Sequence, residues 1–397
     1  MDGRPIPPVR VQGVAARDVP CSTVSVPNVP PATDAGTVRA WSPGRITLIG
    51  DHTDYAEGVS LAVAVGLGTE VTFHCDPRAT AISVASDALP GTALIDLDVP
   101  LDPAALRTSQ PPWARYVAAT VATVRPSAGG RAMLRSTLPV GAGLSSSAAM
   151  CVATALAFGL DGDPITVART CQRAEQAATG VEVGLLDPWA LAVATPGAAT
   201  LLDFHTGLAR PVPLPAGADL VVVHSGQQRS LDRSAYQARR VECDAASYRL
   251  GPLGQVEPEA VLGLPDPVLR RRARHVVTEC DRVRWFVEAI GRGDLPEAGR
   301  LMLASHRSLS EDFEVSTPTL DGLVNRLAAM PGVHGARLTG AGFGGCVVAL
   351  ADPGAIDLRS LRGPAWRVTA TGGAQLGPVP HLDDPPWSDR GPRSPQA

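Results

Sequence analysis

The chain has 397 residues, of which 45% are hydrophobic and 19% charged, and its formal net charge at pH 7 is −4. This composition supports a sizeable buried core in one large domain or two ordinary ones, and it gives no indication of a surface for nucleic acid or a membrane. All 35 basic residues are arginine, which excludes a Walker A lysine and lysine Schiff-base chemistry.

The seven cysteines form neither a CxxC pair nor a cluster with histidines. We therefore expect free thiols, and neither a disulfide framework nor a zinc site. The first residues lack the apolar stretch of a secretory signal, and no apolar run approaches the roughly 18 residues that span a bilayer. These features predict a cytoplasmic protein, and a monomer is compatible with them.

Strand-like and helix-like runs alternate between two proline-rich ends, 1–36 and 372–397, which are expected to be extended or mobile. Strands are predicted at 45–49, 59–65, 71–74 and 81–84, a helix at 112–124, a strand at 133–138, and helices at 148–159, 164–179 and 189–194. Further strands are predicted at 220–223, 333–338 and 346–350, and further helices at 267–291, 295–309 and 318–330. Without regular βαβ alternation, this pattern indicates an α+β fold. A proline-rich stretch at 210–215 suggests two domains, 37–210 and 211–371.

A turn rich in glycine and serine connects the predicted strand 133–138 to the helix that follows. Glycines adopt backbone conformations that other residues avoid, and a helix start presents free N–H groups and the positive end of its dipole. Such a turn suits a chain of phosphates, and its three consecutive hydroxyls can donate to phosphate oxygens or bind Mg²⁺. The alternative is an alanine-rich core helix capped by a serine. The candidate phosphate-binding residues are Gly141, Ala142, Gly143, Leu144, Ser145, Ser146 and Ser147.

A second turn, after the predicted strand 45–49, concentrates hydrogen-bonding groups within four residues. It contains Asp51, His52 and Asp54. A sugar offers several hydroxyl groups that each need a partner at a fixed angle, and one carboxylate can accept from two of them. The alternative is a solvated turn whose aspartates bond to the local backbone.

These two segments resemble signatures of the GHMP kinases. The string 138–149 resembles the ATP-phosphate loop of that superfamily, which uses backbone amides in place of a lysine, and 44–55 resembles the galactokinase signature. The segments 335–346, 271–279 and 305–318 also resemble galactokinases, so the resemblance covers most of the chain between residues 40 and 350. It implies an N-terminal ribosomal-S5-like domain and a C-terminal ferredoxin-like α+β domain, with the active site in the cleft between them.

The resemblance also implies a reaction and a set of residue roles. ATP would phosphorylate the anomeric hydroxyl of galactose or a related hexose, with Asp187 as the base and Arg45 beside it to stabilise negative charge. Ser147 and Glu175 would bind Mg²⁺. The sugar would be held by Asp51, His52, Asp54, Gly184 and Tyr236. On the residues alone, Asp187 followed by Pro188 is also an ordinary helix N-cap.

Two departures from the family keep other substrates open. Galactokinases usually carry glutamate where this chain has Asp51, and glutamine where it has Pro188. A kinase for another sugar or a cyclitol in a specialised biosynthetic pathway is therefore an alternative, and a regulator that binds sugar and ATP without turnover is a second one. The segment 335–346 is expected to pack against the phosphate loop, with Cys346 as a small buried residue.

Overall fold

The computed structural model describes residues 36–99, 102–139, 141–228 and 233–377. Most of each predicted proline-rich end, at 1–35 and 378–397, lies outside the described residues. Within the described residues, helices and strands are mixed without βαβ repetition, which agrees with the predicted α+β class.

The larger sheet contains the N-terminal strands and one short strand from near the end of the chain. Its strands are β1 (Thr37–Ile49), β2 (Val59–Asp76), β3 (Ala81–Ser86), β4 (Thr92–Asp96), β5 (Gly129–Ser136), β6 (Ala198–Asp203), β7 (Leu208–Pro213) and β12 (Gln375–Leu376). Their order is β12-β1-β2-β5-β3-β4, and β6 pairs with β2 and β7. The pairs are antiparallel, except that β3 and β5 run parallel.

The hairpin of β1 and β2 is longer than the sequence predicted. The expected strands at 59–65 and 71–74 both belong to β2, which pairs with β1 on both sides of an irregularity. The register shifts between Pro43 and Gly44, where β2 has two extra residues, Gly66 and Leu67. A bulge bends a strand without ending it, so the apolar pattern is interrupted while the pairing continues.

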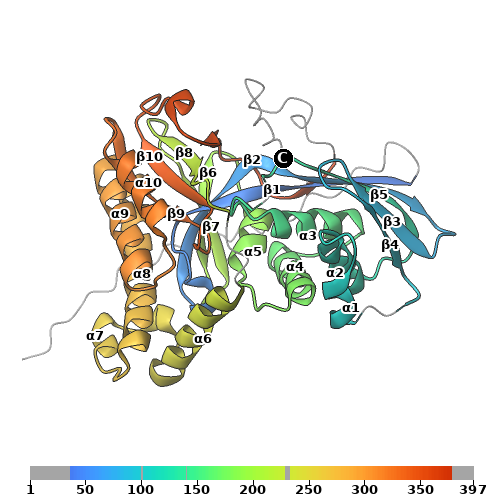
Figure 1. Cartoon of the computed structure of the whole chain (residues 1–397), viewed down its shortest axis with the longest axis horizontal. Helices are drawn as coiled ribbons and strands as arrows, with labels where there is room; N and C mark the ends of the chain where they lie inside the picture. Colours follow the sequence, from blue (N-terminus) through green and yellow to red (C-terminus); the bar gives the residue numbers. More distant parts are fainter. Residues whose placement is uncertain (1–35, 100–101, 140, 229–232, 378–397) are drawn as a thin grey trace, which may run out of the picture.

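The helices of this half are α1 (Pro103–Thr108), α2 (Ala114–Val124), α3 (Ser146–Ala157), α4 (Pro164–Thr179) and α5 (Leu186–Val193). Figure 1 shows α2–α5 gathered beneath the larger sheet. The α4 helix has its predicted bounds, because Asp163 accepts from the amide of Thr166 and Pro164 occupies the first turn. The α3 helix packs on β1 and β2 through fully buried alanines, whose small side chains allow a close approach.

The smaller sheet contains β8 (Asp219–His224), β9 (Val333–Thr339), β10 (Cys346–Ala351) and β11 (Ala365–Val368). Its order, β11-β8-β10-β9, is antiparallel throughout and places the first and third strands of this half in the centre, as in a ferredoxin-like sheet. The helices α6 (Arg233–Leu250), α7 (Pro258–Val261), α8 (Pro267–Gly291), α9 (Leu295–Glu311) and α10 (Pro318–Ala328) connect β8 to β9. Short 3₁₀ turns are η1 (Asp54–Ala56), η2 (Leu253–Gln255) and η3 (Leu358–Ser360).

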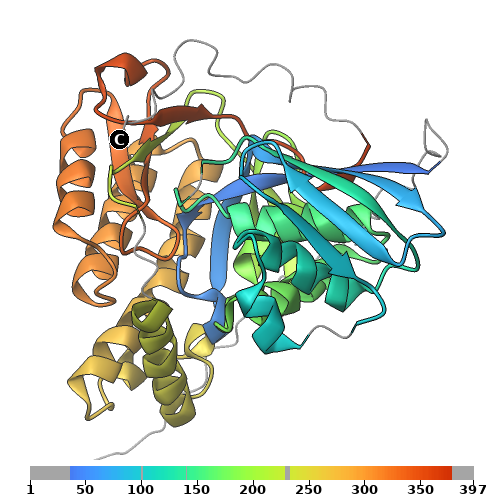
Figure 2. The same ribbon diagram turned by 45° about the vertical axis from the view of Figure 1, so that its right-hand side comes forward.

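The α8 helix joins the two halves of the protein. Its Val283 and Phe286 are fully buried in the same hydrophobic core as β1 and β2. In both views the blue strands β1 and β2 run from the larger sheet toward this orange helix (Figures 1 and 2). The β7 strand ends at Pro213 and β8 begins at Asp219, and β12 returns to the larger sheet from within the stretch 372–397. Among the described residues, no helix combines the length and the apolar character needed to cross a membrane.

Candidate active site

A cavity of about 510 Å³ opens where the two predicted turns meet. Its walls come from both halves of the chain, because the turn after β9 and the helix α6 close one side. It is lined by most of the residues predicted from the sequence, namely Arg45, Asp51, His52, Asp54, Gly141, Gly143, Ser145, Ser146, Ser147, Glu175, Gly184, Asp187 and Tyr236. The side chains of Ala142 and Leu144 are instead buried in the hydrophobic core beneath the phosphate loop.

Asp187 lies in the first turn of α5 and is held by two side chains from other elements. Arg45 Nε and Nη2 lie 2.8 and 2.6 Å from Asp187 Oδ1, and the Ser145 hydroxyl donates to Oδ2 at 2.7 Å. The N-cap of α5 is Leu185, so the interpretation of Asp187 as a helix cap is wrong. The side chain of Asp187 is 30% exposed, whereas Arg45 is buried, so the carboxylate has a free edge toward the cavity.

The phosphate loop has the left-handed backbone that its glycines predicted. Gly141, Gly143 and Ser145 have φ angles of 75°, 78° and 62°. Ser145 is the N-cap residue of α3, but its hydroxyl bonds to Asp187 and does not cap the helix. The first amides of α3 therefore have no side-chain cap from Ser145, and they lie at the edge of the cavity together with the positive end of the helix dipole.

Ser147 and Glu175 form a hydroxyl–carboxylate pair beside the phosphate loop, with Ser147 Oγ donating to Glu175 Oε1 at 2.6 Å. Both are hard oxygen donors, and Mg²⁺ commonly takes one or two protein oxygens together with phosphates and water. The described residues contain no group of three or more His, Cys, Asp or Glu side chains arranged for a metal. The pair therefore fits a magnesium ion that is bound mainly by a nucleotide.

Asp54 lies against the start of α5. The Leu186 amide donates to Asp54 Oδ2 at 3.2 Å, and a Cβ at Gly184 would lie only 1.7 Å from the same oxygen. Burial raises the pKa of Asp54 to about 6, and the nearby charge of Asp187 adds to this rise, while the Leu186 amide opposes it. Gly184 thus leaves the space that Asp54 occupies.

His52 stands beside Asp54 in a left-handed conformation with φ of 66°. One ring nitrogen lies 3.0 Å from the Tyr55 hydroxyl, and the other lies 3.3 Å from the Ala341 carbonyl oxygen. The ring of Tyr236, on the unpredicted helix α6, has its centroid 5.9 Å from that of His52. The three predicted sugar ligands His52, Asp54 and Tyr236 therefore gather at one end of the cavity.

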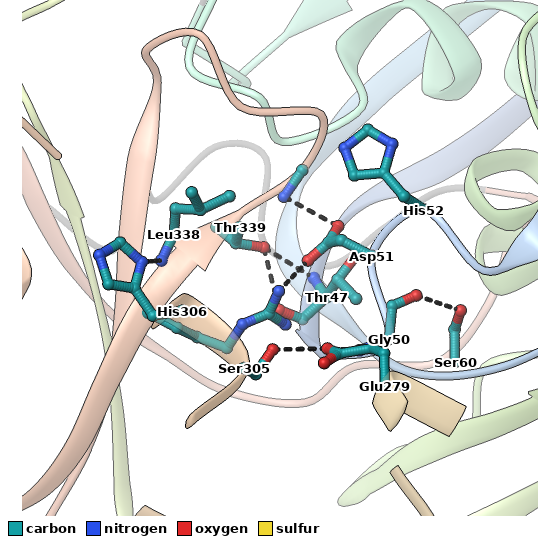
Figure 3. A network of polar contacts seen from close by, with 12 residues as sticks. Thr47, Gly50, Asp51, His52, Ser60, Glu279, Ser305, His306, Leu338 and Thr339 are labelled. Atoms are coloured by element: carbon teal, nitrogen blue, oxygen red, sulfur yellow. Dashed lines mark hydrogen bonds and ion pairs between the residues drawn. The ribbon is translucent and has the colours of Figure 1, made fainter. Parts of the chain in front are cut away.

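Asp51 differs from its neighbours, because it is 2% exposed and both carboxylate oxygens have partners in the C-terminal half. Arg337 Nη2 lies 2.6 Å from Oδ2, and the Gly340 amide donates to Oδ1 at 3.1 Å (Figure 3). Sequence reasoning missed Arg337. The segment 335–346 resembled the family, but no local pattern indicated that this side chain pairs with residue 51.

The glycine-rich turn after β9 packs against the phosphate loop, as the sequence predicted. A Cβ at Gly340 would lie 3.3 Å from the Gly143 carbonyl oxygen, and one at Gly345 would lie 3.3 Å from that of Ala142. Cys346 is fully buried, and burial raises the pKa of its thiol to about 12, so it is a packing residue as expected.

The other end of the cavity is more apolar and was not predicted from the sequence. It includes Leu89, Trp113, Arg115, Tyr116, Leu138 and Met150. Arg115 Nη2 donates to the Tyr116 hydroxyl at 3.2 Å, and among the described residues its guanidinium forms no ion pair with a carboxylate. This end combines aromatic faces with one available positive charge, which suits a base and phosphates.

Three family models match parts of the chain: the GHMP kinases N terminal domain at residues 115–194, the GHMP kinases C terminal model at 286–359, and the galactokinase galactose-binding signature at 33–74. The galactokinase of Mycobacterium bovis (strain BCG / Pasteur 1173P2) is 40% identical over 331 residues, covering 79% of this chain and 89% of the relative. The galactokinase of Homo sapiens is 37% identical over 330 residues, covering 79% and 83%. The solved structure of Lactococcus lactis galactokinase complexed with galactose matches with a TM-score of 0.78 and 27% identity, covering 85% of this chain and 95% of that one.

Proposed function

This chain belongs to the galactokinase family, within the two-domain GHMP kinases, and we propose that it transfers the γ-phosphoryl group of ATP to the anomeric hydroxyl of galactose. It is a sugar kinase by this membership, and ATP is its phosphoryl donor. The observation that carries the residue assignments is the Asp187–Arg45–Ser145 contact, at the point where the phosphate loop meets the sugar turn.

Asp187 acts as the general base. Its free edge faces the cavity, and it accepts the proton of the anomeric hydroxyl while the oxygen bonds to phosphorus and ADP leaves. Arg45 orients the carboxylate through two contacts to its Oδ1, and its charge also stabilises negative charge that develops on the phosphoryl oxygens. Pro188 does not disturb this arrangement, because α5 forms around it and Asp187 still meets Arg45.

The nucleotide lies along the phosphate loop. Uncapped amides at the start of α3 bind phosphate oxygens, and the apolar end of the cavity around Trp113 and Met150 holds the base. Arg115 supplies positive charge at this end of the cavity. Ser147 and Glu175 hold Mg²⁺, which neutralises the phosphate charge when it is bound.

The sugar occupies the opposite end, where Asp54, His52 and Tyr236 offer partners for its hydroxyl groups. The Leu186 amide donates to one oxygen of Asp54, and a carboxylate can accept further hydrogen bonds from hydroxyl groups. Because the Asp54 carboxylate lies near Asp187, a sugar bound to Asp54 is held close to the base.

A coupled assay of ADP release with galactose, other hexoses and cyclitols tests the proposal. We expect turnover with galactose and Mg-ATP, and recovery of galactose 1-phosphate as the product. Turnover of a cyclitol or another sugar with a higher kcat/KM would assign the chain to a different substrate. Binding of ATP and galactose without ADP release would favour a regulator.

A further inference from the structure

The sugar turn, residues 50–54, is bound by a buried network of polar side chains from the C-terminal half. The proposed chemistry does not use this network. Glu279, on α8, is fully buried, and its Oε1 accepts from the Gly50 amide at 3.0 Å and from the Ser305 hydroxyl (Figure 3). Burial alone would raise the pKa of Glu279, but the neighbouring charges of Arg282 and Arg337 and the Ser305 hydroxyl outweigh it and lower the pKa to about 2. Glu279 is therefore ionised when it accepts the hydrogen bond from the Gly50 amide.

His275, one helical turn earlier on α8, contacts the peptide group that joins Asp51 to His52. Its Nε2 lies 3.2 Å from the Asp51 carbonyl oxygen, and its Nδ1 lies 3.0 Å from the Ser308 hydroxyl. A carbonyl oxygen can only accept, so Nε2 carries the proton. Burial lowers the pKa of His275 to about 4, so the ring is neutral at pH 7 and its Nδ1 carries no proton.

The side chain of Asp51 completes this arrangement through its bonds to Arg337 and to the Gly340 amide. Three side chains of the C-terminal half thus contact two backbone groups and one side chain of residues 50 and 51. Glu279 fixes the Gly50 amide, His275 fixes the Asp51 carbonyl, and Arg337 fixes the Asp51 carboxylate. We call Asp51, His275, Glu279 and Arg337 the turn clamp.

His52, which follows Asp51 in the sequence, has a backbone conformation that residues other than glycine rarely adopt. His52 has φ of 66°, and such positions persist when the surrounding contacts over-determine them. The ring of Phe313 is fully buried between His52 and His275, with both centroid distances at 4.6 Å. The clamp therefore sets where the His52 ring points and, two residues later, where Asp54 lies.

We propose that Asp51 is a positioning residue of this clamp and not a ligand of the sugar, and that α8 and β9 thereby set the geometry of the sugar site. The inference rests on the proposed function for the identity of the sugar and its ligands. Because both oxygens of Asp51 already touch their donors, the extra methylene of a glutamate, roughly 1.5 Å, would push the carboxylate into Arg337 and Gly340. Asp51→Glu should therefore impair every sugar substrate alike.

A double-mutant-type cycle, in which protein side chains and sugar hydroxyl groups are removed singly and together, tests whether Asp51 positions the site or contacts the sugar directly. We would measure kcat and KM for galactose and for its 2-, 4- and 6-deoxy derivatives with the parent enzyme, Asp51→Asn, Glu279→Gln and Arg337→Lys. If the clamp positions the site, each variant raises the sugar KM by about tenfold or more, by the same factor on all four sugars, while the KM for ATP stays unchanged.

Asp219→Asn is the matched control. Asp219 lies on β8, in the smaller sheet that also contains Arg337. Like Asp51, it accepts from one arginine and one glycine amide, namely Arg367 at 2.6 Å and Gly354 at 2.9 Å. Unlike Asp51, it does not line the cavity. This variant should lower thermal stability and leave the sugar KM unchanged.

Loss of the Asp51→Asn effect on one deoxy sugar alone would show that Asp51 bonds to that hydroxyl and would overturn the inference. Parent-like sugar KM values for Glu279→Gln and Arg337→Lys would overturn it as well, and these two variants decide the matter if Asp51→Asn does not fold. Failure of the parent enzyme to turn over galactose would instead refute the proposed function.

Discussion

Replacement of Gly184 by alanine tests the role of Asp54 through a steric conflict that the structure defines. The added Cβ would lie 1.7 Å from Asp54 Oδ2 and 2.6 Å from its Cγ, well inside van der Waals contact. The φ of Gly184 lies outside the left-handed region, so backbone strain does not contribute. Asp54 must therefore retreat by more than about 1 Å, and its bond from the Leu186 amide must lengthen or break.

The size of the effect follows from that displacement. Misplacing a substrate-positioning group by about 1 Å typically costs about 100-fold in rate, which corresponds to about 2.7 kcal/mol of transition-state stabilisation. We expect Gly184→Ala to lower kcat/KM for galactose by about this factor. The KM for ATP should be unchanged, because the three atoms nearest to the added Cβ all belong to Asp54.

The assay is steady-state ADP release with galactose varied at saturating Mg-ATP, supported by thermal melting of each variant. Gly217→Ala is the control, since no atom lies within 4 Å of the added Cβ and activity should be parent-like. In an Asp54→Ala background, Gly184→Ala should cost little more, because the conflict is gone. A folded Gly184→Ala enzyme with the parent's kcat/KM for galactose would refute the reasoning that Asp54 holds the sugar where it stands.

Further outcomes follow from the other carboxylates. Asp187→Asn keeps the shape of the site but removes the base, so kcat should fall at least about 100-fold with galactose binding retained, measured by turnover and by calorimetry; near-parent turnover would contradict the assignment. Ser147→Ala and Glu175→Gln should each raise the Mg²⁺ concentration needed for half-maximal rate with the galactose KM unchanged; parent-like titrations would place the metal elsewhere. Because burial raises the pKa of Asp54 to about 6, its carboxylate is about nine-tenths ionised at pH 7 and mostly protonated at pH 5, so kcat/KM for galactose should fall as the pH drops through 6. An Asp54→Asn variant should lack that acidic limb.

The parts of the structure that sequence reasoning predicted well carry local signals. The bounds of α8 and α4 follow from an aspartate cap with proline in the first turn, and the phosphate loop follows from glycines at positions with positive φ. The helix α6 was missed, because its charged residues give it little apolar periodicity. The position of Tyr236 at the sugar site was therefore available only through the family resemblance.

The contacts that define the clamp could not be predicted from local pattern. Arg337 is 286 positions from Asp51 in the sequence, and His275 is 224 positions away. No periodicity or cap records such a pairing, and an arginine in a strand is as compatible with a solvated face as with a buried ion pair. The resemblance predicted that residues 51, 52 and 54 all hold the sugar, but the sequence did not predict the contacts of Asp51 with Arg337 and Gly340.

The three aspartates of the site illustrate how environment assigns a role to one chemical group. Asp51 has a cation and an amide on its two oxygens, both from the other half of the protein, so its charge is fully used in holding the fold together. Asp54 accepts from the Leu186 amide and has a pKa raised to about 6, so it can accept from hydroxyl groups at pH 7 and loses its charge in mild acid. Asp187 is held by Arg45 on one oxygen and by Ser145 on the other, and its side chain is still 30% exposed, so a base in this position keeps its orientation and can reach a substrate proton.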